Sequence, residues 1–205
     1  MFSRRVSVEV PNDLLQQAAK GSSVYQKTVP LAPGKYRLNV VAKDVVSGNM
    51  NNYELALDVP RFDEEALSAS SLILADLLEK VPTKSIGTGQ FVIGTSKVRP
   101  RLSETFLQSE KMGIYMQLYN FAQDETTKKP NGTIEYEIVK VGSNEKVFEF
   151  SEDVATVAGN ATQLTIEKLL PLKDMAPGQY TLKLKVTDKT KNQILTPSVN
   201  FTVTG

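Results

Sequence analysis

An internal repeat constrains the fold of this chain more than any other feature of its sequence. Residues 32–59 align without gaps to residues 176–203, with an offset of 144 positions, and seven of the 28 aligned pairs are identical. The identical pairs are Ala32/Ala176, Pro33/Pro177, Gly34/Gly178, Tyr36/Tyr180, Leu38/Leu182, Asp44/Asp188 and Val59/Val203. The spacing of the apolar residues is preserved as well. We therefore expect two copies of one structural unit.

Each copy predicts two strands joined by a hairpin turn. Apolar residues occupy every second position from Tyr36 to Ala42 and again from Tyr180 to Val186. This alternation is typical of strands with one buried and one solvated face. Polar turns follow at residues 47–49 and 189–192, as a hairpin requires. The return strands would place Leu55, Leu57 and Val59, or Val199, Phe201 and Val203, on the inner face.

A short motif precedes the first strand of each copy. Leu-x-Pro-Gly-x-Tyr at residues 31–36, and its relative at 175–180, fits the corner that enters strand F of immunoglobulin-like sandwiches. In that corner the tyrosine hydroxyl bonds to nearby backbone. We interpret this set as structural rather than as ligand contacts: Pro33, Gly34, Tyr36, Pro177, Gly178 and Tyr180.

The second copy follows a full set of strand patterns. Strands are predicted at residues 72–77, 90–93, 113–119, 133–139, 147–150 and 163–168. Residues 63–78 could instead form a helix, because Asp63 and Glu64 could open one. With the closing hairpin, these strands predict a complete sandwich over residues 67–205.

The first copy has a much shorter lead-in. We expect only a strand at residues 6–10, a short helix near residues 13–20 that ends at Gly21, and a strand at 24–29. Residues 1–60 would then be the C-terminal half of a first sandwich, and a complete domain would begin upstream of Met1. Residues 61–66 would be a linker. The predicted fold class is all-β, with tandem immunoglobulin- or fibronectin-III-like sandwiches of which the first is incomplete.

Composition excludes several classes of function. The chain has no histidine and no cysteine, which removes the usual acid–base group, thiolate nucleophiles, disulfides and the common zinc ligands. Its 24 basic and 23 acidic residues leave a net charge of +1, so no nucleic-acid partner is indicated. No apolar run is long enough for a membrane span, and the first residues do not form a signal peptide.

Three aromatic residues mark the one predicted partner surface. Tyr115, Tyr119 and Phe121 alternate with Ile114, Met116 and Leu118, so this strand would be apolar on both faces. Such a strand is either central in the core or part of an interface.

Acidic residues and serines give weaker signals. Residues 63–65 are acidic but lack the alternating spacing of a calcium loop, so a solvated linker is favoured. Glu135 and Glu137 share one strand face, which the apolar residues between them place toward solvent. A serine nucleophile would lack a histidine base. We expect no catalytic residue, no cofactor and no metal.

Four phrases together resemble a known family. VYQKTVPLAPGKYRL, VPRFDEEALSASSLILADLLEKVP, GTGQFVIGTSKVRPRL and MGIYMQLYNF are similar to the C-terminal region of acidobacterial GWxTD domain-containing proteins. The resemblance covers essentially the whole chain, although the GWxTD motif itself is absent. It implies a larger exported parent protein, an extracytoplasmic location, and partners among its other domains or among envelope proteins.

These observations favour a non-catalytic structural or protein-interaction module. The alternative is a carbohydrate-binding accessory module beside an enzyme domain. That alternative usually needs exposed tryptophan for stacking, and the chain has no tryptophan.

Overall fold

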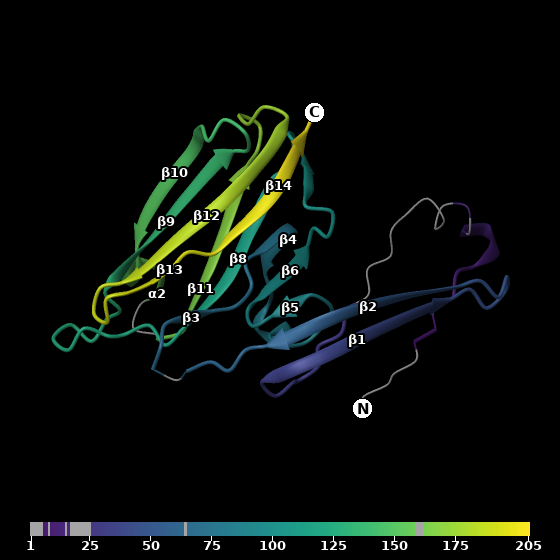
Figure 1. Cartoon of the computed structure of the whole chain (residues 1–205), viewed down its shortest axis with the longest axis horizontal. Helices are drawn as coiled ribbons and strands as arrows, with labels where there is room; N and C mark the ends of the chain where they lie inside the picture. The colour runs from purple at the N-terminus through teal and green to yellow at the C-terminus, as the bar shows by residue number, and fades with distance from the viewer. Residues whose placement is uncertain (1–5, 8, 15, 17–25, 64, 159–161) are drawn as a thin grey trace. The chain divides into compact units, whose positions relative to one another are not determined.

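A computed structural model describes residues 6–7, 9–14, 16, 26–63, 65–158 and 162–205 (Figure 1). The chain divides into two compact units, Met1–Leu31 and Ala32–Gly205. The described residues of the first unit include a 3₁₀ helix at Asn12–Leu14. The domain boundaries expected from the repeat, near residues 60 and 66, stay a prediction.

Two strands predicted before the first copy are wrong for the residues that the structure describes. Residues 6–7, 9–10 and 26–29 lie outside any strand. Val6, Val10 and Val29 are exposed, so no neighbouring sheet buries an alternating face there. The helix expected near residues 13–20 falls mostly outside the described residues.

The first copy of the repeat forms a two-stranded antiparallel sheet. Strand β1 (Gly34–Lys43) pairs with β2 (Met50–Val59), from Gly34 opposite Val59 to Lys43 opposite Met50. Three apolar pairs therefore lie on one face of this hairpin, Tyr36 with Leu57, Leu38 with Leu55 and Val40 with Tyr53. These six residues are called the hairpin face below.

The second copy belongs to a six-stranded sheet with the order β10-β9-β12-β14-β7, and β13 also pairs with β12. All pairs are antiparallel except β14 with β7. The strands are β7 (Thr105–Leu107), β9 (Gly132–Lys140), β10 (Lys146–Asp153), β12 (Gly178–Asp188), β13 (Gln193–Leu195) and β14 (Ser198–Thr204). Gly178 lies opposite Val203 and Tyr180 opposite Phe201.

A second six-stranded sheet has the order β11-β8-β4-β6-β5, and β3 also pairs with β8. The strands are β3 (Ser68–Ala69), β4 (Ile73–Lys80), β5 (Val92–Ile93), β6 (Ser96–Pro100), β8 (Lys111–Tyr119) and β11 (Leu164–Pro171). A 3₁₀ helix, Thr83–Ser85, lies between β4 and β5, and the short helix α2 (Val154–Ala158) lies between β10 and β11.

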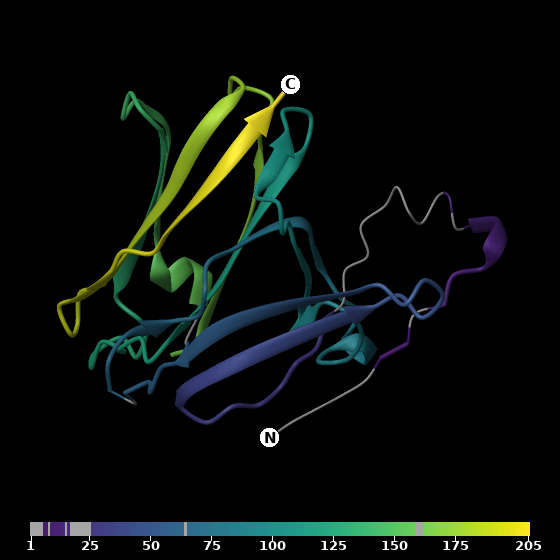
Figure 2. The same cartoon turned by 45° about the vertical axis from the view of Figure 1, so that its right-hand side comes forward.

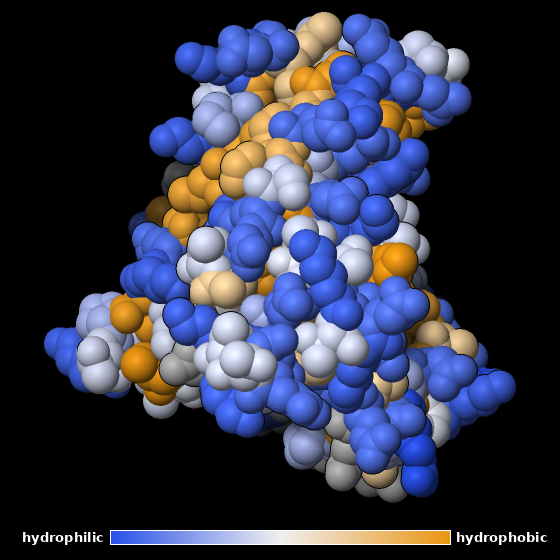
Figure 3. Space-filling view, turned by 90° about the vertical axis from the view of Figure 1, so that its left-hand side faces the viewer, coloured by the Kyte–Doolittle hydropathy of each residue, from blue (hydrophilic) through white to orange (hydrophobic). Residues whose placement is uncertain are grey.

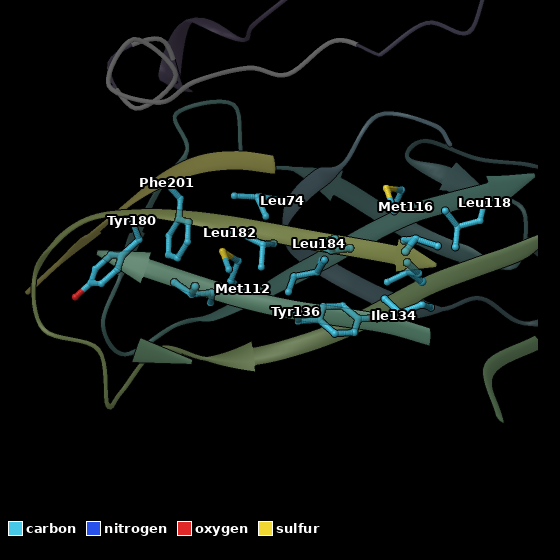
Figure 4. Packing of buried hydrophobic residues seen from close by; sticks show 14 of the residues in the cluster. Leu74, Met112, Met116, Leu118, Ile134, Tyr136, Tyr180, Leu182, Leu184 and Phe201 are labelled. Atoms are coloured by element: carbon cyan, nitrogen blue, oxygen red, sulfur yellow. The ribbon is translucent and has the colours of Figure 1, made fainter. Parts of the chain in front are cut away.

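The two large sheets form two layers around one core, and they are called the sandwich below (Figures 1 and 2). Side chains of β9, β12 and β14 point toward those of β4 and β8 (Figure 4). Buried members of the cluster include Met112, Ile114, Met116 and Leu118 from one sheet and Ile134, Tyr136, Ile138, Leu182, Leu184 and Phe201 from the other. The chain is therefore all-β with a sandwich-like arrangement, as the alternation predicts.

Several strand predictions are confirmed, with shifted ends. Residues 63–78 contain β3 and the start of β4 rather than a helix. The strand predicted at 90–93 is reduced to Val92 and Ile93, whereas that at 163–168 continues to Pro171. Strands β6 and β7 were not predicted, because β6 contains basic residues and a proline and β7 has only three residues.

The turns of the two hairpins share the same local backbone geometry. A residue with positive φ stands four positions after an aspartate, Gly48 (φ 75°) after Asp44 and Asn192 (φ 53°) after Asp188. Glycine and asparagine tolerate this conformation best. Hydrogen bonds from the Ser47 hydroxyl and then from backbone N–H groups hold the pKa of Asp44 below its usual range. The turn chemistry is therefore encoded locally in both copies.

Candidate interaction surfaces

The predicted aromatic surface is mostly core. Tyr115 is 2% exposed and Phe121 is 1% exposed, so neither side chain can reach a partner. Phe121 packs in the main core, and Tyr115 packs with Ala75 and Val98 on the outer side of its sheet. Only Tyr119 is half-buried. This strand could be central in the core or part of an interface, and Tyr115 and Phe121 pack in the interior.

Tyr119 borders a shallow pocket of about 400 Å³. The ring centroid of Phe62 lies 6.0 Å from that of Tyr119, and the two rings are tilted by 53°. Asp63, Ser70 and Asn120 complete the lining. Burial raises the pKa of Tyr119, whose hydroxyl donates to Oε1 of Gln117 over 2.7 Å. The pocket therefore combines two aromatic rings with polar groups.

Asn120 fastens the segment before the sandwich to the end of β8. Its Nδ2 donates to the carbonyl oxygens of Asp63 (2.9 Å) and Ala66 (3.2 Å). The backbone N–H of Leu67 donates to Oε1 of Gln193 over 2.7 Å. The position of Phe62 beside Tyr119 is thus set by hydrogen bonds as well as by ring packing.

The six residues of the predicted corner occupy equivalent places in the two copies. The Tyr36 hydroxyl donates to the carbonyl oxygen of Ala32 over 2.8 Å. The Tyr180 hydroxyl donates to the carbonyl oxygen of Ala176 over 2.6 Å. Pro33 with Gly34, and Pro177 with Gly178, supply the turn between each carbonyl and its tyrosine. Both hydroxyls are therefore engaged by their own backbone.

A polar cluster lies on the outer side of the second sheet. The Ser96 hydroxyl donates to Glu167, and Lys80 Nζ lies 2.5 Å from the other carboxylate oxygen of Glu167. Burial, and then the nearby charge of Glu167, raise the pKa of Tyr115 to about 12. Ser96 is fully buried and has no access to a substrate. This cluster fastens β4, β6 and β11 together rather than activating a nucleophile.

A second polar network links the two sheets at one side of the sandwich. Glu152 on β10 accepts from the Tyr136 hydroxyl and from Lys168 Nζ, both over 2.6 Å. Burial, and then the interaction with Glu152, raise the pKa of Tyr136. Because Lys168 belongs to β11, the network joins the edge strands of the two sheets.

The same side of the molecule carries exposed apolar residues. An apolar band crosses a largely hydrophilic surface on the side that Figure 3 shows. Val147 and Phe150 on the edge strand β10 are exposed, and Phe150 packs against Tyr136 at 5.8 Å between ring centroids. Lys168 Nζ lies 5.7 Å from the Phe150 ring centroid. The aromatic ring of Phe150 is therefore already engaged by its own sheet and by a cation.

The carboxylates considered from the sequence are engaged in ion pairs or turns. Glu135 pairs with Lys185 (3.3 Å), and Glu137 pairs with Lys146 (3.0 Å), both on the solvent side of the sheet. Asp188 is buried and accepts three backbone N–H groups, those of Ala122 (2.8 Å), Thr190 (2.9 Å) and Lys191 (3.0 Å). Among the described residues, no group of three or more acidic side chains could hold a metal ion.

Four of the six residues of the hairpin face are exposed and two, Tyr36 and Leu57, are half-buried, whereas their equivalents Tyr180, Leu182, Leu184 and Phe201 in the second copy are buried. Leu38 is 42% exposed and its equivalent Leu182 is 0% exposed; Val40 is 48% exposed and Leu184 is 1% exposed. Sequence reasoning placed all of these residues on the inner face of a sandwich. It had no signal for the exposure of the first set, because the two patterns are alike.

No helix in the described part of the chain is long and apolar enough to cross a membrane. No protein-family model matches the chain, and no curated protein is significantly similar to it.

Proposed function

We propose that the chain is a non-catalytic structural or protein-interaction module, built from immunoglobulin- or fibronectin-III-like sandwiches. The observation that carries this proposal is the recurrence of one hairpin with the same register and the same tyrosine-to-backbone bond. Repetition of a packing unit, without repetition of any reactive group, is typical of modules that act by assembly.

The strand order supports the finer fold assignment. With β12 and β14 taken as strands F and G, β9 and β10 follow as C and C′ in the same sheet. The opposite sheet then presents β11, β8 and β4 as E, B and A. The tyrosine at the start of β12 bonds to backbone four residues upstream, as the tyrosine corner of such sandwiches does.

The chemistry of the chain supports a non-catalytic role. It has no histidine or cysteine, and the polar clusters described above consist of side chains that bond to one another. The carboxylates of Glu135 and Glu137 are paired with lysines on the outer face. We further propose, from the resemblance to GWxTD domain-containing proteins, that the module belongs to a larger exported bacterial protein.

A pull-down from a bacterial envelope extract tests the interaction role. The full chain serves as bait, and a matched bait lacks residues 67–205. We expect the full chain to retain a reproducible set of envelope proteins that the shortened bait loses. A partner set that the deletion leaves unchanged would contradict the role proposed for the sandwich.

A carbohydrate-binding role is the second candidate, and the pocket beside Tyr119 favours it. Its two aromatic rings could stack on a sugar, while Asp63, Ser70 and Asn120 offer polar groups nearby. A glycan array with the full chain and with Phe62→Ala tests it. Binding that the substitution removes would support this candidate, and an array without any bound glycan would exclude it.

A further inference from the structure

The pocket beside Tyr119 leaves aromatic surface open to an occupant. Phe62 packs against Tyr119 with the ring centroids 6.0 Å apart, and the rings are tilted by 53° rather than stacked. Phe62 is nevertheless 50% exposed, so much of its ring is uncovered. Asp63, Ser70 and Asn120 supply the polar part of the lining. An occupant therefore meets aromatic surface and polar atoms together.

The amide of Asn120 can offer this occupant only an acceptor. Its Nδ2 donates to the carbonyl oxygens of Asp63 (2.9 Å) and Ala66 (3.2 Å). A side-chain amide has two N–H hydrogens, so both are used. The two carbonyl partners also fix which end of the amide is nitrogen. The Oδ1 atom of Asn120 is therefore left to accept a hydrogen bond.

The two hydroxyl groups of the lining have used their hydrogens as well. The Ser70 hydroxyl donates to the carbonyl oxygen of Ser71 over 3.0 Å and accepts from the backbone N–H of Gln117 over 2.9 Å. The Tyr119 hydroxyl donates to Oε1 of Gln117 over 2.7 Å. A hydroxyl has a single hydrogen to donate. The side chains of the lining therefore offer acceptors, which calls for an occupant that donates.

Asp63 adds a negative charge that has no cation beside it. Its Oδ1 accepts the backbone N–H of Glu65 over 2.8 Å. Within the part of the chain that the structure describes, no ion pair includes Asp63. Lys191, which contacts the same segment, donates through Nζ to the carbonyl oxygen of Glu65 instead. The pocket therefore lacks a positive charge of its own.

A guanidinium group meets all of these conditions at once. It is planar, stacks on aromatic faces, carries five N–H donors and matches the geometry of a carboxylate. A sugar hydroxyl donates too, but it has no charge to match that of Asp63. A quaternary ammonium has the charge but no N–H to donate. The pocket volume of about 400 Å³ leaves room for a side chain of this size.

We propose that the pocket formed by Phe62, Asp63, Ser70, Tyr119 and Asn120 receives an arginine side chain of a partner protein. The guanidinium stacks on the open aromatic surface and donates to the Asp63 carboxylate and to Oδ1 of Asn120. This inference rests on the proposed protein-interaction role and names the group by which the partner is anchored. Arginine is among the residues that carry most of the binding energy in protein interfaces.

A titration of the full chain with N-acetyl-arginine N′-methylamide is the direct test. We expect saturable changes in the NMR shifts of the Phe62 ring and of the backbone amides of Asp63, Ser70 and Asn120. The citrulline derivative is the matched probe, because it has nearly the same shape without the charge. It should bind at least about fivefold more weakly, since hydrogen bonds to charged groups are the stronger ones.

Substitution of Asp63 tests the same charge from the side of the protein. Asp63→Asn keeps the size of the side chain and should weaken binding of the arginine derivative about fivefold or more, while binding of the citrulline derivative changes little. The matched control is Asp174→Asn, at an exposed acidic residue between β11 and β12, which should leave both affinities unchanged. Asp63 is exposed, so we expect both variants to fold, and circular dichroism checks this.

Two further probes test other occupants. Choline should bind more weakly than the arginine derivative, and tighter binding of choline would assign the pocket to a free quaternary ammonium and overturn the proposal. Glycan-array binding that Phe62→Ala removes would assign it to sugars and overturn the proposal as well. Equal binding of the arginine and citrulline derivatives would have the same consequence.

Failure of the arginine derivative to bind would overturn this inference alone. The broader interaction role would still stand if the envelope pull-down showed partners that deletion of residues 67–205 removes. The two failures are therefore distinguishable.

Discussion

The hairpins β1–β2 and β12–β14 have the same register and the same tyrosine corner, but only the second is buried. Leu38 and Leu182 are identical residues at equivalent places, and their exposed fractions are 42% and 0%. The difference teaches that register and corner geometry are local properties of the hairpin. Burial depends on strands elsewhere in the chain: β9 pairs with β12 in the second copy, whereas in the part of the chain that the structure describes β1 pairs with β2 alone.

The largest expected difference between the two hairpins comes from truncating the equivalent leucine in each copy. Leu182→Ala should lower the free energy of unfolding by about 2–5 kcal/mol, because it leaves a cavity among buried side chains. Leu38→Ala should cost less than about 1 kcal/mol, since its side chain loses little buried surface. Urea unfolding followed by circular dichroism measures both. Equal losses would mean that the first hairpin is covered in the isolated chain.

A second test acts on the strand that covers only the second copy. A Cβ at Gly132, opposite Asp188, would collide with the carbonyl oxygen of Thr187 and lie 2.6 Å from the Phe121 ring. Gly132→Ala should therefore cost about 3 kcal/mol through overpacking. Gly48→Ala is the control, with open space at its Cβ and only the positive φ of 75° to oppose it, and should cost about 1 kcal/mol. A harmless Gly132→Ala would argue against the close β9–β12 pairing.

Removing the tyrosine hydroxyl from each corner compares the contribution of the two corner hydrogen bonds to stability. Tyr180→Phe should cost about 1–2 kcal/mol, because the Ala176 carbonyl loses its partner in a part-buried place. Tyr36→Phe should change stability by about 0.5 kcal/mol or less, since water can replace the hydroxyl at the exposed Ala32 carbonyl. Unfolding free energies of the two variants test this. The reverse order would mean that the first corner is the more buried.

The pH dependence of stability at alkaline pH tests the burial of two tyrosines on strands β8 and β9. The pKa of Tyr115 is raised to about 12, and that of Tyr136, opposite Leu184, is also raised. Below pH 10 both tyrosines are protonated in both states. From pH 10 upward the unfolded tyrosines lose protons that the folded ones keep, so stability falls toward pH 12. Urea unfolding between pH 8 and 11.5 should show this fall, and Tyr115→Phe should reduce it. A flat profile would contradict the burial of both hydroxyls.

Much of the sandwich could be predicted from the sequence. The strands from Ile73, Lys111, Gly132, Lys146 and Leu164 follow from alternation, and the two hairpins follow from the repeat. The inward direction of Ile134, Tyr136 and Ile138, with the glutamates outward, was also predicted and is confirmed. Strand β7 was missed because three residues are too few for a pattern, and its partner β14 lies almost a hundred residues away.

The candidate sites were harder to predict. Tyr115 and Phe121 form no surface, because a second small cluster covers Tyr115 and the main core encloses Phe121. Phe62 gave no signal in the sequence, and its place beside Tyr119 depends on hydrogen bonds from Asn120 to the carbonyl oxygens of Asp63 and Ala66. Such contacts join residues more than fifty positions apart, and no local pattern records them.

Alternation, turn residues and the repeated Pro-Gly-x-Tyr motif are enough to define two equal hairpins, because each depends on neighbours along the chain. Which of the two is buried follows from the packing of distant strands, since Leu182 lies in the main core between β9 and β14, whereas within the described residues β1 pairs with β2 alone. The pattern of side chains predicts which face of a strand is apolar. Only the tertiary structure shows whether that face is buried against other strands, because burial depends on the whole arrangement of the sheets.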